Sequence, residues 1–190
     1  HDVDAFLDSI TILLKDTGIF VIEVPYLLNF FHKNEFDTSY HEHLSYFLVK
    51  PFIPLFERHD MEIFDIKKFT IHGGSIRVYV KKKINKNIPV DQDAIQWLLE
   101  LERDLGLYDI NTYHNFAKDV EKIKSDLVEL LLKLKKQGKI IAAYGASAKG
   151  NVLTNYCGIG KDIISFVVDD TPEKQGYLTP GNRIPIVPPS

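Results

Sequence analysis

The chain has 190 residues, of which 45% are hydrophobic and 26% are charged. These ordinary globular values exclude a disordered, collagen-like or low-complexity chain, and a formal net charge of -3 gives no electrostatic reason to expect a nucleic acid as the main partner. The single cysteine, Cys157, excludes an intrachain disulfide and any zinc site built on several cysteines of this chain. It suits a reducing compartment, so we expect a cytoplasmic protein.

The first residue is His1 and the one methionine is Met61, so we expect an internal piece of a longer protein. No basic segment followed by an apolar one opens the chain, and a signal peptide is therefore not predicted. The longest apolar runs, such as residues 19–22, are far shorter than a membrane span. We expect no membrane partner.

Apolar residues at helical spacing predict a helix over residues 6–14, with Gly18 as its stop. The continuous apolar run 19–24 then predicts a strand covered on both faces, as in a parallel sheet. Its polar residue Glu23 lies near the carboxyl end, where open α/β sheets place ligands.

Residues 26–47 follow no clean period and hold several histidines, aromatic residues and acids. An amphipathic helix is predicted over 48–59. The runs 61–69 and 76–82 predict two antiparallel strands joined by a Gly-rich turn.

The second half begins with two predicted helices. The first covers residues 91–105, and the second carries a leucine-rich stripe and ends at Gly138. An α/β pattern then restarts, with a strand over 139–144, a loop over 145–150, a helix to about residue 156, a strand over 163–169 and an extended tail over 171–190.

The run from Tyr40 to His43, which reads Tyr-His-Glu-His, is the first candidate site. A histidine takes up a proton near neutral pH, and a neighbouring carboxylate or phenol sets its tautomer. In an extended segment His41 and His43 would share one face, and Tyr40 and Glu42 the other. A metal pair of His41 and His43, or plain hydrogen bonding within the fold, remains open as an alternative. The third metal ligand would be His32 or Asp37.

The second candidate is the run His72-Gly73-Gly74-Ser75 with Arg77. Paired glycines let the backbone approach a ligand closely. An arginine can pair with a phosphate or a carboxylate in bidentate fashion. The alternative is a β-turn beside an exposed arginine.

The third candidate is the strand-to-helix turn over residues 144–151. A helix N-terminus attracts anions, and Ser147 and Lys149 would add a hydroxyl and a charge. The turn lacks the full Gly-rich dinucleotide spacing and the P-loop pattern. Asp169 and Asp170 stand where a Rossmann unit would hold a ribose-binding acid. The alternative is a tight turn without a ligand.

These runs resemble the sugar C-methyltransferases, which use S-adenosylmethionine and act on nucleotide-linked keto-deoxysugars. The similar segments are 23–26, 36–46, 72–77, 144–151 and 169–181, which span almost the whole chain. The resemblance implies an α/β fold: the C-terminal part of a class I methyltransferase sheet, followed by a small Rossmann-like domain.

The resemblance also implies a division of the chain. Residues 1–85 would complete the methyltransferase core, 86–137 would be a helical connector, and 138–190 the Rossmann-like domain. In the family, a cysteine-rich zinc-binding segment and the Gly-rich S-adenosylmethionine loop lie upstream of the part that this chain matches. We therefore expect most cofactor contacts, and any zinc, outside this chain.

Family logic assigns His43 as the base that removes a proton from the carbon next to the ketone, with Tyr40 and Glu42 orienting it or shuttling the proton. His41 is often Asp in the family and receives no role. The residues expected to bind substrate are Tyr26, Tyr46, His72, Gly73, Gly74, Ser75, Arg77, Tyr144, Ser147, Lys149 and Asn151. Two alternatives remain: a nucleotide-sugar binding module without chemistry of its own, and a dehydrogenase-like NAD domain built on residues 145–170.

Overall fold

The structure is a computed structural model that describes residues 2–70 and 73–189. It divides into two compact units: residues 1–33 with 45–113, and residues 34–44 with 114–190. The boundary falls inside the long helix α5 (Ile110–Lys136), so each unit is described by itself. The predicted mixed α/β character is confirmed, with one antiparallel and one parallel sheet of three strands each.

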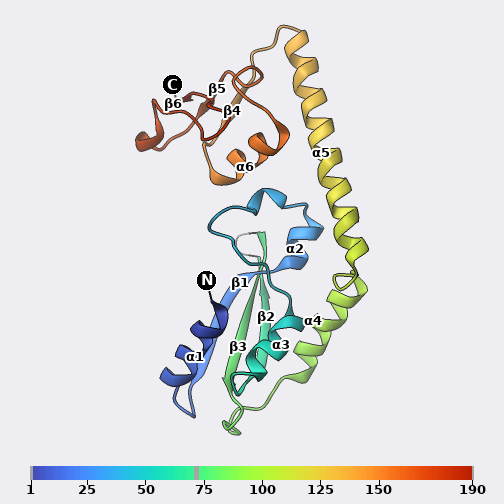
Figure 1. Cartoon of the computed structure of the whole chain (residues 1–190), viewed down its shortest axis with the longest axis vertical. Helices are drawn as coiled ribbons and strands as arrows, with labels where there is room; N and C mark the ends of the chain where they lie inside the picture. The colour runs from blue at the N-terminus through green and yellow to red at the C-terminus, as the bar shows by residue number, and fades with distance from the viewer. Residues whose placement is uncertain (1, 71–72, 190) are drawn as a thin grey trace. The chain divides into compact units, whose positions relative to one another are not determined.

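The first unit is built on the antiparallel sheet β1-β3-β2, formed by β1 (Ile19–Pro25), β2 (Met61–Phe69) and β3 (Ser75–Lys82) (Figure 1). The predicted pairing of β2 with β3 is confirmed. The prediction of a parallel sheet around β1 is wrong, because β1 runs antiparallel to β3 at the edge of the sheet. Its outward residues Ile19 and Val21 are 49% and 41% exposed.

The first unit contains the helices α1 (Val3–Leu13), α2 (Leu27–His32), α3 (Val49–Glu57) and α4 (Gln92–Asp104), as well as the first turn of α5. The helices predicted around residues 6–14, 48–59 and 91–105 are thereby confirmed. Both α3 and α4 pack on β2 (Figure 1). Phe52 and Phe56 of α3 stack in the core, with ring centroids 5.5 Å apart. Burial of such aromatic side chains supplies much of the stability of a small core.

The second unit holds the parallel sheet of β4 (Ala142–Tyr144), β5 (Phe166–Val168) and β6 (Ile186–Val187) (Figure 1). The strands predicted over 139–144 and 163–169 are present but shorter. The tail over 171–190 was expected to be wholly extended loop, but it contributes β6 and the 3-10 helix η3 (Pro172–Lys174). Its apolar Ile184 and Ile186 are buried, which explains why this proline-rich segment folds.

Two helices accompany this sheet. The C-terminal half of α5 packs Leu127, Val128 and Leu131 onto the core of the unit, as the leucine-rich stripe predicts. The helix α6 (Ala148–Cys157) ends at Gly158, whose φ of 67° lies in the left-handed region that favours glycine. The short helix η1 (Phe36–Thr38) also belongs here, with Phe36 against Tyr156 of α6 at 5.4 Å between ring centroids.

Candidate functional site

The turn between β4 and α6 is shaped by its own residues. Gly145 has a φ of 90°, and its N–H donates to the carbonyl of Val168 at 2.7 Å. Ser147 caps α6, since its hydroxyl oxygen accepts the N–H of Gly150 at 3.1 Å. Lys149 lies exposed in the first turn of the helix. The predicted strand-turn-helix arrangement is therefore present, with a cationic side chain beside the positive end of α6.

Asp169 fixes this turn from the end of the neighbouring strand. Its carboxylate accepts the N–H of Ala146 at 2.6 Å and the N–H of Thr171 at 2.9 Å, and Lys174 lies 3.2 Å away. These bonds to Thr171, with further ones to Ala146 and Lys174, hold the pKa of Asp169 well below its usual range. Its neighbour Asp170 accepts the hydroxyl of Tyr144, which raises the pKa of that phenol.

A cavity of about 930 Å³ opens beside the turn. All of the residues that line it belong to the second unit. Three of the four residues predicted here to bind substrate line it: Tyr144, Ser147 and Asn151. The fourth, Lys149, does not. Tyr40 and His41 also line the cavity, so two of the predicted sites meet within one unit.

The segment around Tyr40 is a turn rather than the extended strand that the alternation argument assumed. The N–H of His43 donates to the carbonyl of Tyr40 at 2.9 Å, and the two rings meet edge to face with centroids 5.0 Å apart. Tyr40 and His43 are therefore neighbours, contrary to the expectation that they lie on opposite faces. His43 is half-buried, and Glu42 and His41 are exposed.

Tyr26, expected to bind substrate, is a core residue. It is 1% exposed, and its hydroxyl donates to Glu102 of α4 at 2.9 Å. Burial, together with the carboxylate of Glu102, raises the pKa of Tyr26 well above its usual value. Glu102, which no sequence motif marks, is fully buried and also accepts the backbone N–H of Val49 at 2.6 Å at the start of α3. An acidic residue on a predicted amphipathic helix gave no signal for this capping role.

The residues of the Gly-Gly-Ser-Arg run also contact other residues of the first unit. Glu23 accepts the hydroxyl of Ser75 at 2.8 Å and the guanidinium of Arg77 at 2.8 Å. Gly74 has a φ of 135°, and a Cβ there would lie 1.3 Å from the amide nitrogen of Asn29. Lys33 donates to the carbonyl of Gly73. The close approach that the paired glycines predict is thus made by the protein's own α2.

The remaining predictions in this region are placed as follows. Tyr46 is half-buried and lies against Phe30, with ring centroids 4.8 Å apart. His72 lies outside the described residues. Within the described ranges, no three His, Cys, Asp or Glu side chains are grouped so as to hold a metal ion. No helix among those residues is long and apolar enough to cross a membrane.

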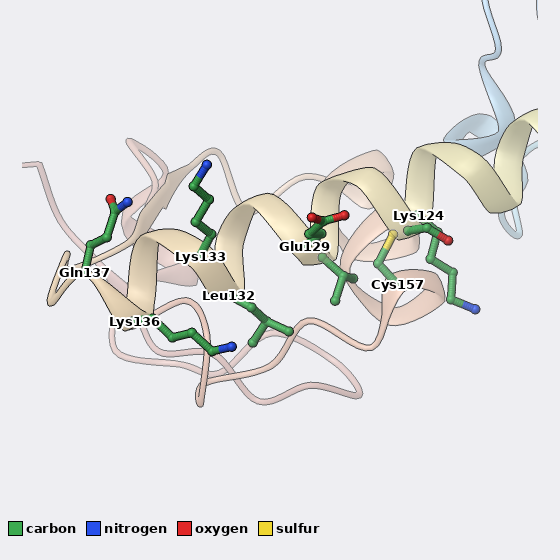
Figure 2. A pocket seen from close by; sticks show the side chains of 9 residues that line it. Lys124, Glu129, Leu132, Lys133, Lys136, Gln137 and Cys157 are labelled. Carbon is green, nitrogen blue, oxygen red and sulfur yellow. The ribbon is translucent and has the colours of Figure 1, made fainter.

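A second cavity, of about 730 Å³, runs along α5 and includes Cys157 (Figure 2). None of the predicted site residues line it. The side chains of Lys124, Lys133 and Lys136 spread away from one another rather than converging on one point (Figure 2). Cys157 is 6% exposed, and burial raises the pKa of its thiol. A neutral buried thiol is a poor nucleophile.

The chain is similar to known carbon methyltransferases. Residues 70–190 match the family model described as the C-methyltransferase C-terminal domain. The chain is also 37% identical over 185 residues to the C-methyltransferase NovU of Streptomyces niveus, an alignment that covers 97% of this chain. The chain spans only 44% of the length of that relative.

Proposed function

Because this chain belongs to the family of the C-methyltransferase C-terminal domain, we propose that it is the substrate-handling part of an enzyme that methylates carbon. The proposed acceptor is the carbon next to the ketone of a nucleotide-linked deoxysugar, as the motif resemblance implies. The observation that carries the proposal is the shared cavity. Tyr40, which contacts His43, lines it together with the turn that precedes α6.

The finer fold assignment is part of this proposal. We assign the first unit to the C-terminal end of a class I methyltransferase sheet. The exposed apolar side chains of Ile19 and Val21 support this, because strands of sheets that are covered on both faces carry apolar residues on both faces. We assign the second unit to a small Rossmann-like domain, since its strands are parallel and its polar turn lies at their carboxyl ends.

The proposed chemistry begins with a weak carbon acid. His43 would take the proton from the carbon next to the ketone, and the electron pair would move into an enolate. Tyr40 packs against His43 and restricts the orientation of its ring. The hydroxyl of Tyr40 would donate to the ketone oxygen, where negative charge develops. Glu42 is exposed in the same turn and would carry the proton onward.

The family implies S-adenosylmethionine as the methyl donor, but the described residues do not make a site for it. Glu23 is the carboxylate near the end of β1, and it is already held by Ser75 and Arg77. The role of this chain lies in holding the acceptor and moving its proton.

A second candidate is a nucleotide-sugar binding module without chemistry. It is favoured by one observation: among the described residues, neither Glu42 nor His43 has a side-chain hydrogen bond that fixes its position. A dehydrogenase-like NAD domain has less support. Asp169, the acid in the ribose-binding position, already accepts two backbone N–H groups and faces Lys174.

The experiment that separates these candidates measures exchange of the acidic hydrogen of the acceptor with solvent. In the natural-length protein, His43→Asn is expected to lower kcat by roughly 10²–10⁴, the usual contribution of one positioned base. The same substitution should lower the rate of solvent exchange by a similar factor. His114→Asn, which changes an exposed histidine of α5 outside the cavity lining, serves as the matched control and should leave exchange in place.

Two results would count against the assignment. If exchange persists in His43→Asn while methyl transfer stops, proton abstraction belongs to another group, and the pair Tyr40 and Glu42 is next in line. If the wild-type protein neither exchanges the hydrogen nor transfers a methyl group but binds the sugar nucleotide, the binding module is the correct function.

A further inference from the structure

The cavity of the second unit is larger and more apolar than an anion site requires. Its walls include Leu131 of α5, Ala143 of β4, Leu153 of α6 and Val167 of β5, so every layer of the unit contributes. Polar groups gather at the turn before α6 and around Tyr40. A pocket of several hundred Å³ with apolar walls and a few polar groups is typical of a small-molecule site.

Thr179 adds a polar group inside this apolar lining. It is 8% exposed, and its hydroxyl oxygen accepts the N–H of Ile184 at 2.9 Å. A hydroxyl that accepts one bond still has its own hydrogen to donate. Burying that donor without a partner is costly, so a ligand atom that accepts it would be favoured.

The proposed substrate has three chemically different parts, and they suit different parts of the cavity. A diphosphate is an anion and suits the turn that precedes the α6 N-terminus, with Ser147 and the nearby Lys149. The sugar must reach Tyr40, which lines the cavity and contacts His43, and its polar groups need hydrogen-bond partners that apolar walls do not supply. The flat, weakly polar part is the base.

We propose that the apolar cavity between α5, α6 and the parallel sheet holds the nucleobase of the sugar nucleotide. The hydroxyl of Thr179 donates to a carbonyl oxygen of the base ring. This inference rests on the proposed function, which supplies the sugar nucleotide. It adds that the second unit selects the nucleotide by its base, whereas the turn before α6 holds any diphosphate.

The test fills the cavity without disturbing its polar rim. Ala143→Leu adds bulk to the wall, and because its side chain borders an open cavity, the larger side chain should fill space without unfolding the unit. Leu131→Phe, which approaches from the helix side, is the second variant in case Ala143→Leu does not fold. Ala117→Leu makes the same change at an exposed position of α5 and is the matched control.

The probes are uridine diphosphate, thymidine diphosphate and inorganic pyrophosphate, with the natural-length protein and calorimetric detection. We expect the wild type and Ala117→Leu to bind one of the nucleoside diphosphates equally well. Both filling variants should bind it at least about tenfold more weakly, with an unchanged or raised melting temperature. Their affinity for pyrophosphate should not change, because the base site alone is blocked.

If a folded filling variant binds the nucleoside diphosphate as tightly as the wild type does, the base lies elsewhere and the inference is overturned. The proposed function would then stand. Failure of the wild type to bind either nucleoside diphosphate, together with failure to methylate any sugar nucleotide, would overturn the proposed function. The inference would fall with it. Weaker binding of pyrophosphate and nucleoside diphosphate alike would also overturn the inference, since the variants would then have disturbed the anion site.

Discussion

The polar residues that the motifs point to behave differently in the two units. In the first unit, Glu23 accepts hydrogen bonds from Ser75 and Arg77, and Glu102 accepts one from Tyr26. In the second unit, Tyr144, Ser147 and Asn151 border a large cavity. The same residue types therefore hold the fold together in one unit and face a space of ligand size in the other. A motif identifies a constrained position, and the partners of its side chains show what constrains it.

The largest expected effect tests the first half of this comparison. Replacing Glu102 by Ala leaves the buried hydroxyl of Tyr26 and the N–H of Val49 without their acceptor, together with the hydroxyl of Tyr108, which donates at 2.6 Å. We expect the free energy of unfolding to fall by about 3–5 kcal/mol, because several hydrogen-bond donors lose their acceptor at a cost of about 1–3 kcal/mol for each buried one. Urea denaturation measures it. Glu100→Ala, an exposed change on the same helix, is the control and should be nearly neutral.

Much of the first unit could be read from the sequence, because apolar spacing reports burial directly. The strands β2 and β3 and the helices α3 and α4 follow from it. The neighbour of β1 could not be read, since an apolar strand pairs equally well in either direction. Partners distant in sequence could not be predicted either, such as Glu102 of α4, which accepts the N–H of Val49 at the start of α3 from 53 residues away.

The candidate site was less predictable than the fold. The turn at Gly145 was readable because a strand, small residues and a helix follow one another. The conformation of the segment around Tyr40 could not be predicted, because it depends on local backbone hydrogen bonds such as the one from His43 to Tyr40, and on the packing of Phe36 against α6. No periodic pattern in the sequence predicts such a turn. The residues were found by resemblance, and their arrangement only by structure.

Asp169 belongs to the second unit but is held by the protein's own groups, like the motif residues of the first unit. Although it stands at the end of β5 beside the proposed site, its carboxylate is engaged by Ala146, Thr171 and Lys174. By the same criterion it is a structural residue. Asp169→Asn should lower the free energy of unfolding by about 1–3 kcal/mol, the cost of disrupting a buried hydrogen-bonded group. A weaker affinity for substrate with unchanged stability would show that the carboxylate binds ligand.

Lys149 tests the second half of the comparison, in which polar residues of the second unit are proposed to bind a ligand. It is exposed near the start of α6, and the hydrogen bonds recorded for the described residues give its ammonium group no partner. Lys149→Ala should raise KM by about tenfold, equivalent to about 1.4 kcal/mol, with little change in kcat, because the charge binds ground state and transition state alike. Stability should not change. Lys161→Ala, an exposed lysine beyond the same helix, is the control. A collapse of kcat alone would give Lys149 a different role.

The smallest expected effect concerns a charge cluster that ties α1 to the end of α3. Asp4 accepts the guanidinium of Arg58 at 2.7 Å and lies 2.8 Å from a ring nitrogen of His59, whose other nitrogen faces Asp8 at 2.9 Å. These hydrogen bonds, that of Arg58 first, lower the pKa of Asp4 to about 2.

A carboxyl group whose pKa is lower in the folded state stabilises the fold fully above its unfolded pKa, near 3.9. That contribution is lost as the pH falls from about 4 through about 2. The urea midpoints of the wild type and Asp4→Asn should therefore differ at pH 6 and converge toward pH 2. Asp16→Asn, which removes an exposed carboxylate facing Lys82, controls for the loss of one surface charge. Because Asp4 is exposed to solvent and its ion pairs are screened, added salt should shrink the difference at pH 6. A difference between wild type and Asp4→Asn that stays constant from pH 6 to pH 2 would mean that the cluster does not hold α1 in place.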